Sequence, residues 1–208
     1  MPLFPFFAPH STRGIMPRVK QFDEEEVLQK AVDLFWRKGY HATSIQDLVT
    51  ELGINRASIY HTYGDKRQLF DRAFESYRSN SLSWVKKFLV QQPSVKEGFQ
   101  ALFTLAIKES ISDPDAKGCF VINCITEFTP EETDLMAILK EHNLGLIDFF
   151  ASYIQTGVDS GELSQDKDVY GIASTLFTLY NGLRVVTKVS REKAAMVAMV
   201  NTALTLFD

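Results

Sequence analysis

The sequence predicts an all-α protein. Apolar residues recur every three or four positions from residue 27 onward, and no stretch alternates apolar and polar residues as a half-buried strand would. Breaks rich in Gly, Pro, Asp, Gln or Ser separate these segments at 91–93, 113–115, 129–130, 160–161 and 190–191. With 45% hydrophobic and 23% charged residues, the composition is that of a globular protein. A packed set of helices is therefore the expected fold class.

The first helix is expected to begin after Asp23. Asp23 and Glu26 have the spacing of an N-terminal cap. The apolar residues that follow at helical spacing are Val27, Leu28, Ala31, Leu34 and Phe35. Because glycine commonly ends a helix, this helix is expected to run to about Lys38 and stop at Gly39.

A second, short helix is expected between Thr43 and Gly53. Thr43 and Gln46 have the Thr-x-x-Gln spacing of a capping box, and apolar residues follow at helical spacing. Gly53 marks its end. The pattern predicts a helix of about two turns.

A third helix is expected over residues 56–62, with Asn55 as its cap. Ile59 and Tyr63 are available to face inward. A longer helix is expected to start at Asp65 and to continue through Tyr77, since Asp65 and Gln68 again have cap spacing.

These short helices have the layout of a helix-turn-helix that reads DNA. Such a motif needs two short helices joined by a tight turn, because the second helix must be held stiffly to enter the major groove. The outward residues of this second helix would be Arg56, Ser58, His61 and Thr62, with Tyr60 near the rim. Short polar groups and a guanidinium suit base edges and phosphates.

Overall charge neither supports nor excludes this interpretation. The 208-residue chain has a formal net charge of -4, so it carries no general excess of basic residues. Residues 16–72 contain as many acidic as basic side chains. DNA contact must therefore come from the local motif.

Several short stretches carry a resemblance to a known family. They read GY at 39–40, ATSIQDL at 42–48, LGINRASIY at 52–60 and YGDK at 63–66, followed by Leu69. With these stretches the sequence resembles the TetR-type transcriptional regulators. The resemblance covers about the first third of the chain after residue 15, and spacing, residue type and helix boundaries agree.

The resemblance implies which residues contact DNA. Ser44 and Gln46 would lie near phosphate and the groove edge, with Thr43 as the helix cap. The family often has His at the position of Thr62, whereas this sequence has it at His61. The full set of candidate DNA-binding residues is Thr43, Ser44, Gln46, Asn55, Arg56, Ala57, Ser58, Tyr60, His61, Thr62 and Lys66. Lys66 corresponds to the family's phosphate contact at a helix N-terminus.

We expect three regions along the chain. Residues 1–15 are expected to be a disordered arm or an upstream start, because Met16 and the residues after it resemble a natural start. Residues 16–66 would form the DNA-binding domain, and residues 67–208 a helical ligand-binding and dimerisation domain. With two cysteines and no apolar run long enough to span a bilayer, the chain suits the cytoplasm, with no membrane partner.

The regulatory half is expected to contain helices at 95–111, 118–128, 131–158, 166–189 and 192–207. The last two are broadly apolar, so they need partners on more than one face. We expect 166–189 and 192–207 to pair with their symmetry mates as a four-helix bundle, which the resemblance also implies. Such a homodimer would place its recognition helices about 34 to 36 Å apart, or a multiple of one DNA turn.

A pocket for a small-molecule effector of unknown identity is expected among the central helices. The candidate residues are Phe103, Ile107, Cys119, Phe120, Asn123, Glu127, Phe150 and Tyr153. An aromatic stripe at helical spacing is more often plain core than a pocket. Asn123 and Glu127 share a helix face, where a mutual hydrogen bond or solvent exposure is the alternative to ligand contact.

The predicted function is a transcriptional repressor that a small-molecule effector releases from double-stranded operator DNA. One alternative is a redox- or electrophile-sensing regulator acting through Cys119, which lies near a predicted helix start after Lys117. Against this stands a purely structural role for two buried thiols. A helical enzyme or interaction protein is a further alternative, although no nucleophile, phosphate loop, metal-ligand spacing or cofactor motif is found.

Overall fold

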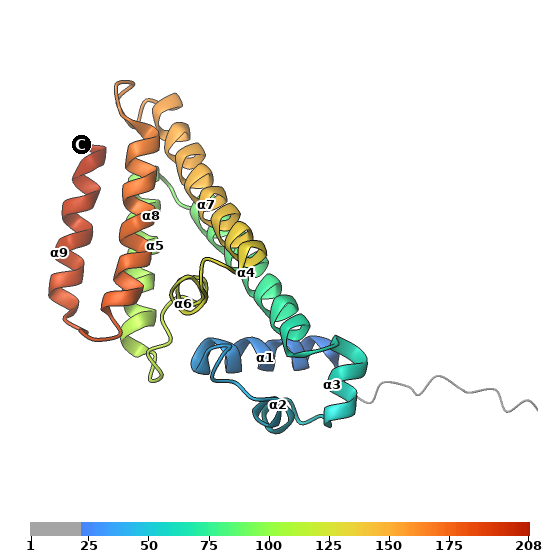
Figure 1. Cartoon of the computed structure of the whole chain (residues 1–208). Helices are drawn as coiled ribbons and strands as arrows, with labels where there is room; N and C mark the ends of the chain where they lie inside the picture. Colours follow the sequence, from blue (N-terminus) through green and yellow to red (C-terminus); the bar gives the residue numbers. More distant parts are fainter. Residues whose placement is uncertain (1–21) are drawn as a thin grey trace, which may run out of the picture.

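The computed structural model describes residues 22–208, so the prediction for residues 1–15 lies outside the described part of the chain. This part contains α-helices and one short 3₁₀ helix and no strand, which confirms the all-α prediction (Figure 1). The elements are α1 (Glu24–Lys38), α2 (Ile45–Leu52), α3 (Arg56–Tyr63), α4 (Lys66–Val90), α5 (Val95–Ser112), α6 (Phe120–Glu127), α7 (Thr133–Asp159), α8 (Val169–Val186), α9 (Lys193–Leu204) and η1 (Thr205–Phe207).

Three of the predicted helix caps are confirmed. The carboxylate of Asp23 accepts hydrogen bonds from backbone N–H groups in the first turn of α1. Asn55 caps α3 by accepting from the N–H of Ser58 at 2.8 Å. Asp65 and Gln68 form a reciprocal capping box at the start of α4. These caps fix where α1, α3 and α4 begin.

The predicted cap of α2 was wrong by one residue. Ser44 caps α2, and Asp47 completes the capping box in place of Thr43 and Gln46. The Asp47 carboxylate accepts from the Ser44 N–H at 2.7 Å and from Lys38 Nζ at 2.6 Å. Thr43 is buried and its hydroxyl donates to the Gly39 carbonyl at 2.5 Å. Ser44 has the better partner because a carboxylate binds a backbone N–H more strongly than an amide does.

The C-terminal helices lie where expected, with shorter ends. The helix predicted over 166–189 is observed as Val169–Val186, and α6 begins at Phe120 rather than at 118. The helix predicted over 192–207 changes to 3₁₀ geometry after Leu204. Helix ends commonly tighten or fray in this way, so their sequence signals are weak.

Two hydrophobic cores stabilise the molecule. One joins α1, α2, α3 and the first half of α4 to α6 and the beginning of α7. The other joins the second half of α4 to α5, α8, α9 and the rest of α7. Figure 1 shows α4 running from the end that carries α1 to α3 into the larger helical part. Thus α4 contributes to both cores, and α6 packs on the core of the helix-turn-helix.

No helix within residues 22–208 is long and apolar enough to cross a membrane.

Candidate DNA-binding interface

The recognition helix α3 is held by one buried face. Ile59 and Tyr63 are buried, as predicted, and the Tyr63 hydroxyl donates to the backbone carbonyl of Glu24 at 3.2 Å. Docking of this face against α1 turns the opposite face of α3 toward solvent. The arrangement of α2, a tight turn at Gly53 and α3 is a helix-turn-helix.

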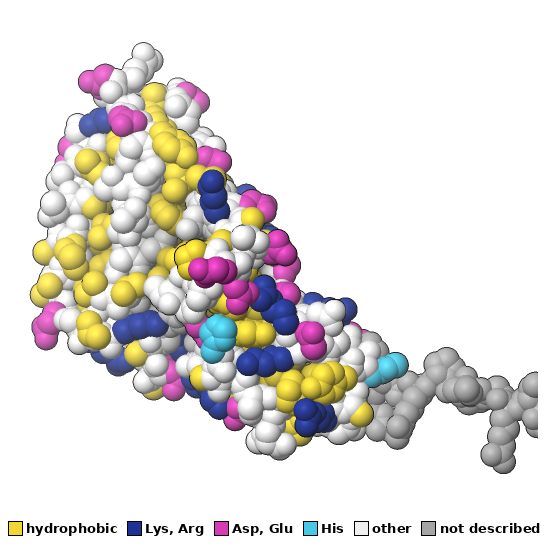
Figure 2. Space-filling model, viewed as in Figure 1, with side chains coloured by type: hydrophobic (Ala, Val, Ile, Leu, Met, Phe, Trp, Pro, Cys, Tyr) yellow, Lys and Arg dark blue, Asp and Glu magenta, His cyan; other side chains and the backbone are white. Residues whose placement is uncertain are grey.

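Most of the predicted DNA-binding residues lie on this accessible side. Those exposed to solvent are Ser44, Gln46, Asn55, Arg56, Ala57, Tyr60 and His61, and those partly exposed are Ser58, Thr62 and Lys66. Thr43 is the exception, because its side chain is buried and fixes the turn before α2. Figure 2 shows Lys and Arg side chains beside a hydrophobic patch at the lower right, over the end that carries α2 and α3.

Arg56 is available for an external partner. Its guanidinium lies 5.7 Å from the centre of the Tyr60 ring, and its Nη2 donates to the Tyr60 hydroxyl at 3.5 Å. No ion pair forms with Arg56 inside residues 22–208. By contrast, Arg37 pairs with Glu51 at 3.2 Å and Lys38 pairs with Asp47. An unpaired guanidinium on an exposed helix suits a phosphate or a guanine edge.

Lys66 lies at the first position of α4. Its ammonium is 4.2 Å from the centre of the Tyr40 ring, which is a cation–π geometry. Partial burial lowers the pKa of Lys66, while the charges of Glu127 and Asp47 oppose this shift. Because Lys66 is the first residue of α4, its ammonium lies near the N-terminus of a helix, where an anion such as phosphate is favoured.

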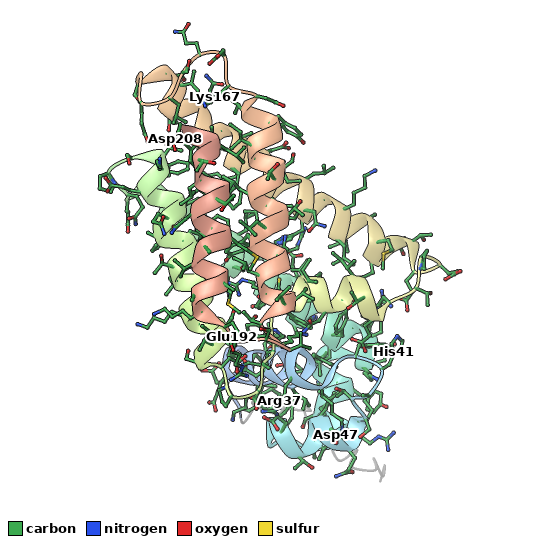
Figure 3. The ribbon with its side chains drawn as sticks, turned by 90° about the vertical axis from the view of Figure 1, so that its left-hand side faces the viewer. Arg37, His41, Asp47, Lys167, Glu192 and Asp208 are labelled. Atoms are coloured by element: carbon green, nitrogen blue, oxygen red, sulfur yellow. The ribbon has the colours of Figure 1, made fainter. Side chains whose placement is uncertain are left out.

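Glu127 makes contacts with the helix-turn-helix that the sequence did not reveal. Its carboxylate, at the end of α6, accepts hydrogen bonds from the backbone N–H groups of Tyr40 at 3.1 Å and His41 at 2.7 Å. These two residues form the turn between α1 and α2 (His41 is labelled in Figure 3). Gly39 permits the approach, because a Cβ there would lie 2.9 Å from Glu127 Oε1. Hence α6 is bonded directly to the helix-turn-helix.

The predicted effector residues are divided between the two cores. Four of them, Phe103, Ile107, Phe150 and Tyr153, are buried in the core of the larger helical part. Phe120 and Cys119 belong to the other core. Because the Tyr153 hydroxyl donates to the Ser94 carbonyl at 3.1 Å, its polar end is already bonded within the fold.

Asn123 and Glu127 do not bond to each other. Asn123 Nδ2 donates to the Lys117 carbonyl at 2.8 Å, and its Oδ1 accepts from Lys188 Nζ at 2.6 Å. The side chains of Asn123 and Glu127 therefore each have a partner from a segment distant in the chain. Contacts over such separations leave no periodic signal in a sequence.

An exposed apolar face runs along α8 and α9. Figure 3 views these two helices side by side. Exposed apolar side chains on them include Val185, Val186, Val197 and Met199, and Val189 is exposed in the segment between them. A shallow groove on the face is lined by Thr175, Leu179, Ala198, Met199, Thr202 and Ala203. Exposed apolar side chains on neighbouring helices are a common feature of protein interfaces.

Comparison with known proteins agrees with this geometry. Residues 27–73 match the family described as "Bacterial regulatory proteins, tetR family", and residues 98–203 match "Tetracyclin repressor-like, C-terminal domain". The uncharacterized HTH-type transcriptional regulator YezE of Bacillus subtilis (strain 168) is 34% identical, over 93% of this chain and 100% of its own. The HTH-type transcriptional repressor ComR of Escherichia coli (strain K12) is 26% identical over 91% of each chain.

A solved structure of similar fold contains DNA. It is a cysteine mutant of the TetR family transcriptional regulator CifR with 26bp double-strand operator DNA. The likeness has a TM-score of 0.81 and 29% identity, and covers 92% of this chain and 100% of that one. With a helix-turn-helix at 45–63 and both halves matched, this chain belongs to the TetR family and is a DNA-binding transcriptional regulator.

Proposed function

We propose that the protein is a homodimeric repressor that binds operator DNA through α3 and is released by a small-molecule effector. The observation that carries the proposal is the exposed face of α3, where Arg56 has no acidic partner among the described residues and Tyr60 is 44% exposed. ComR is named a repressor, and CifR was solved with operator DNA. Repression and release need no catalytic step or cofactor, and the protein acts in the cytoplasm.

Each named residue has a part in this proposal. Arg56, Ala57 and Tyr60 meet bases and backbone, with Asn55, Ser58, His61 and Thr62 at the edges of the same surface. Ser44 and Gln46 at the start of α2 and Lys66 at the start of α4 hold phosphates, because helix N-termini favour anions. Thr43 acts indirectly, by holding the turn that places Ser44.

The homodimer would form through α8 and α9. The exposed apolar side chains and the groove on that face support this, because two such helices can bury their apolar surface in a four-helix bundle with their symmetry mates. Two-fold symmetry then presents two copies of α3 to one side of a DNA duplex, and an operator with matching half-sites is expected.

Release would be a shift between two arrangements of the dimer. We divide the chain into a DNA-binding domain at 16–66 and a regulatory domain at 67–208. An effector that binds the second domain more tightly in one arrangement moves the population toward it. The two bonds from Glu127 to Tyr40 and His41 are a direct connection between the domains.

The decisive experiment measures binding to promoter DNA adjacent to the gene by fluorescence anisotropy, with an excess of unrelated DNA. A regulator should select a pseudopalindromic fragment, and its affinity should fall steeply as salt is raised. If all fragments bind equally weakly at physiological salt, the proposed operator binding is wrong.

A further inference from the structure

A partly buried polar cluster lies where α4, α5, α6 and α8 meet. We define the Arg184 cluster as Tyr77, Glu109, Cys119, Tyr180 and Arg184. The loop before α6 lies directly on α8, since a Cβ on Gly118 would be 2.9 Å from the Arg184 carbonyl oxygen. Polar groups from α4, α5, α8 and the loop before α6 therefore share one location inside the regulatory half.

Arg184 is incompletely satisfied in this cluster. Its Nη2 donates to the Tyr180 hydroxyl at 2.8 Å, and the guanidinium lies 4.7 Å from the centre of that ring. Its Nε is buried and has no hydrogen-bond partner among the described residues. Glu109 Oε2 lies 3.7 Å from Nη2, which is too long for a hydrogen bond. A buried cationic donor without an acceptor is destabilising, so the site favours an additional anion.

The N-terminus of α6 also favours an anion. Cys119 is its N-cap residue but makes no side-chain cap, and the first turn contains no acidic residue. The partial positive charge of this helix end is therefore not offset by its own residues. Lys117 and Lys188 flank the loop, with Lys188 Nζ 2.6 Å from Asn123 Oδ1. The α6 N-terminus and the two lysines thus add to the positive electrostatic potential around Arg184.

The two phenols complete the site as neutral donors. Burial raises the pKa of both Tyr77 and Tyr180, so both hydroxyls keep their protons. Burial by itself would lower the pKa of Arg184, but its electrostatic surroundings raise it, so the guanidinium stays charged. A fixed cation beside neutral hydroxyls suits a carboxylate, which has two acceptor oxygens and no donor.

We propose that the Arg184 cluster binds the carboxylate of a small effector. Arg184 Nε and Nη2 would donate to its two oxygens, with the α6 N-terminus facing the charge and the rings of Tyr77 and Tyr180 against its apolar part. The carboxylate of Glu109 would compete with the ligand for Arg184, and its 3.7 Å contact with Nη2 would be broken when the ligand binds. The other end of α6 carries Glu127, so a shift of α6 on binding acts on the turn at Tyr40 and His41.

The binding test uses the full chain and isothermal titration calorimetry with acetate, butyrate and benzoate, at constant ionic strength set with sodium chloride. At least one of these carboxylates should bind the wild-type protein. Arg184→Gln should raise the Kd of this carboxylate by about tenfold or more, because a charged hydrogen-bond donor is lost. Glu109→Gln should tighten binding, because the competing carboxylate is removed.

A matched control is Arg191→Gln, which removes the same charge a few residues away. Arg191 donates to the carbonyls of Ile111 and Asp113 outside the cluster, so its variant should keep the wild-type Kd. If Arg184→Gln does not fold, Arg184→Lys keeps the charge without the bidentate geometry and should still weaken binding. The proposal is overturned if no carboxylate binds, if Arg184 and Arg191 variants bind alike, or if Glu109→Gln weakens binding.

A second experiment tests whether carboxylate binding is coupled to DNA release. It rests on the proposed function, because it requires an operator. The bound carboxylate should weaken operator binding by wild-type protein. In Glu127→Ala the same carboxylate should bind with unchanged Kd but release less DNA. Titration of the carboxylate requires no DNA, so failure of operator binding and failure of the Arg184 site are separate results. Equal release in Glu127→Ala and wild type overturns the coupling through Glu127.

Discussion

Arg56 differs from Arg37 and Arg67 in what surrounds its guanidinium. Arg37 pairs with Glu51, and Arg67 pairs with Asp71 and Glu132, so both serve the fold. Arg56 contacts only the aromatic side chain of Tyr60 among the described groups. At the scale of single residues, Arg56 is thus proposed as a DNA contact because the fold leaves its guanidinium without an acidic partner among the described residues.

Arg56→Ala should weaken operator binding by about tenfold or more, because a guanidinium contact to a base or phosphate contributes roughly 1–3 kcal/mol. Anisotropy titrations at several salt concentrations measure this. If Arg56 contacts phosphate, the slope of log K against log salt should fall by about one. Lys30→Ala is the control, since Lys30 lies on α1 and pairs with Glu26 at 2.7 Å. Equal affinity of both variants would contradict the role of Arg56.

Two glycines with positive φ differ in what a new Cβ atom would contact. Gly39 has φ +84° and would place a Cβ against Glu127, whereas Gly53 has φ +67° and nothing within 4 Å. Gly53→Ala should cost about 1 kcal/mol through left-handed strain alone. Gly39→Ala should cost more, because φ +84° with ψ 164° is a conformation essentially restricted to glycine and because the new Cβ would also displace the Glu127 carboxylate. Urea unfolding measures both values, and an equal loss would mean that the contact with Glu127 is unimportant.

At the scale of elements, α7 contains a buried histidine. His142 is 8% exposed and its Nδ1 has no hydrogen-bond partner among the described residues. Burial lowers its pKa, Arg78 lowers it further, and Glu75 and Glu141 oppose the shift. The folded protein therefore favours neutral His142.

Acidification should destabilise the protein through His142. Because its folded pKa is below the unfolded value of about 6.5, its contribution is complete above that pH and is lost as pH falls toward the folded pKa. His142→Leu should flatten the decline of the free energy of unfolding between pH 7.5 and 5. His61→Gln, on the exposed face of α3, should leave the decline unchanged. A decline that persists in His142→Leu would assign it to other groups.

Local signals in the sequence predicted most elements but not their connections. Asp23, Asn55 and Asp65 were identified as caps because a cap involves neighbours three residues away. Thr43 was identified as the cap of α2 from its spacing to Gln46, whereas Ser44 is the cap, and its partner Asp47 is also bonded to Lys38 of α1. The role of Glu127 depends on residues more than 80 positions away, so no local pattern could show it.

At the scale of the whole molecule, α4 connects the two cores. It runs from Lys66 to Val90 without glycine or proline, so it has no residue that favours a bend. Motion in the regulatory half can therefore reach the helix-turn-helix through a tilt of α4, through α6, or through α7, whose first turns pack in the same core. The bonds of Glu127 make α6 the element whose movement acts on the turn before α2.

The α8 and α9 face should control assembly. Met199→Arg places a charge on this face, where the native side chain is 41% exposed, and should give a monomer of 23.6 kDa by light scattering. Operator affinity should also fall, since the two DNA-binding domains that contact the two half-sites are no longer joined. Trp84→Arg is the control, because Trp84 is 43% exposed on α4. A dimeric Met199→Arg protein would place the interface elsewhere.

The packing of Trp36 supplies an optical reporter at the junction of α1, α4 and α6. Its indole lies 4.9 Å from the Tyr77 ring and 6.4 Å from the Phe120 ring, with Lys117 Nζ 4.8 Å from its centre. An ammonium and a neighbouring phenol both alter indole emission. Because Trp84 is the second of two tryptophans, Trp84→Phe leaves one emitter, whose spectrum would follow rearrangement of α6 in real time without a label.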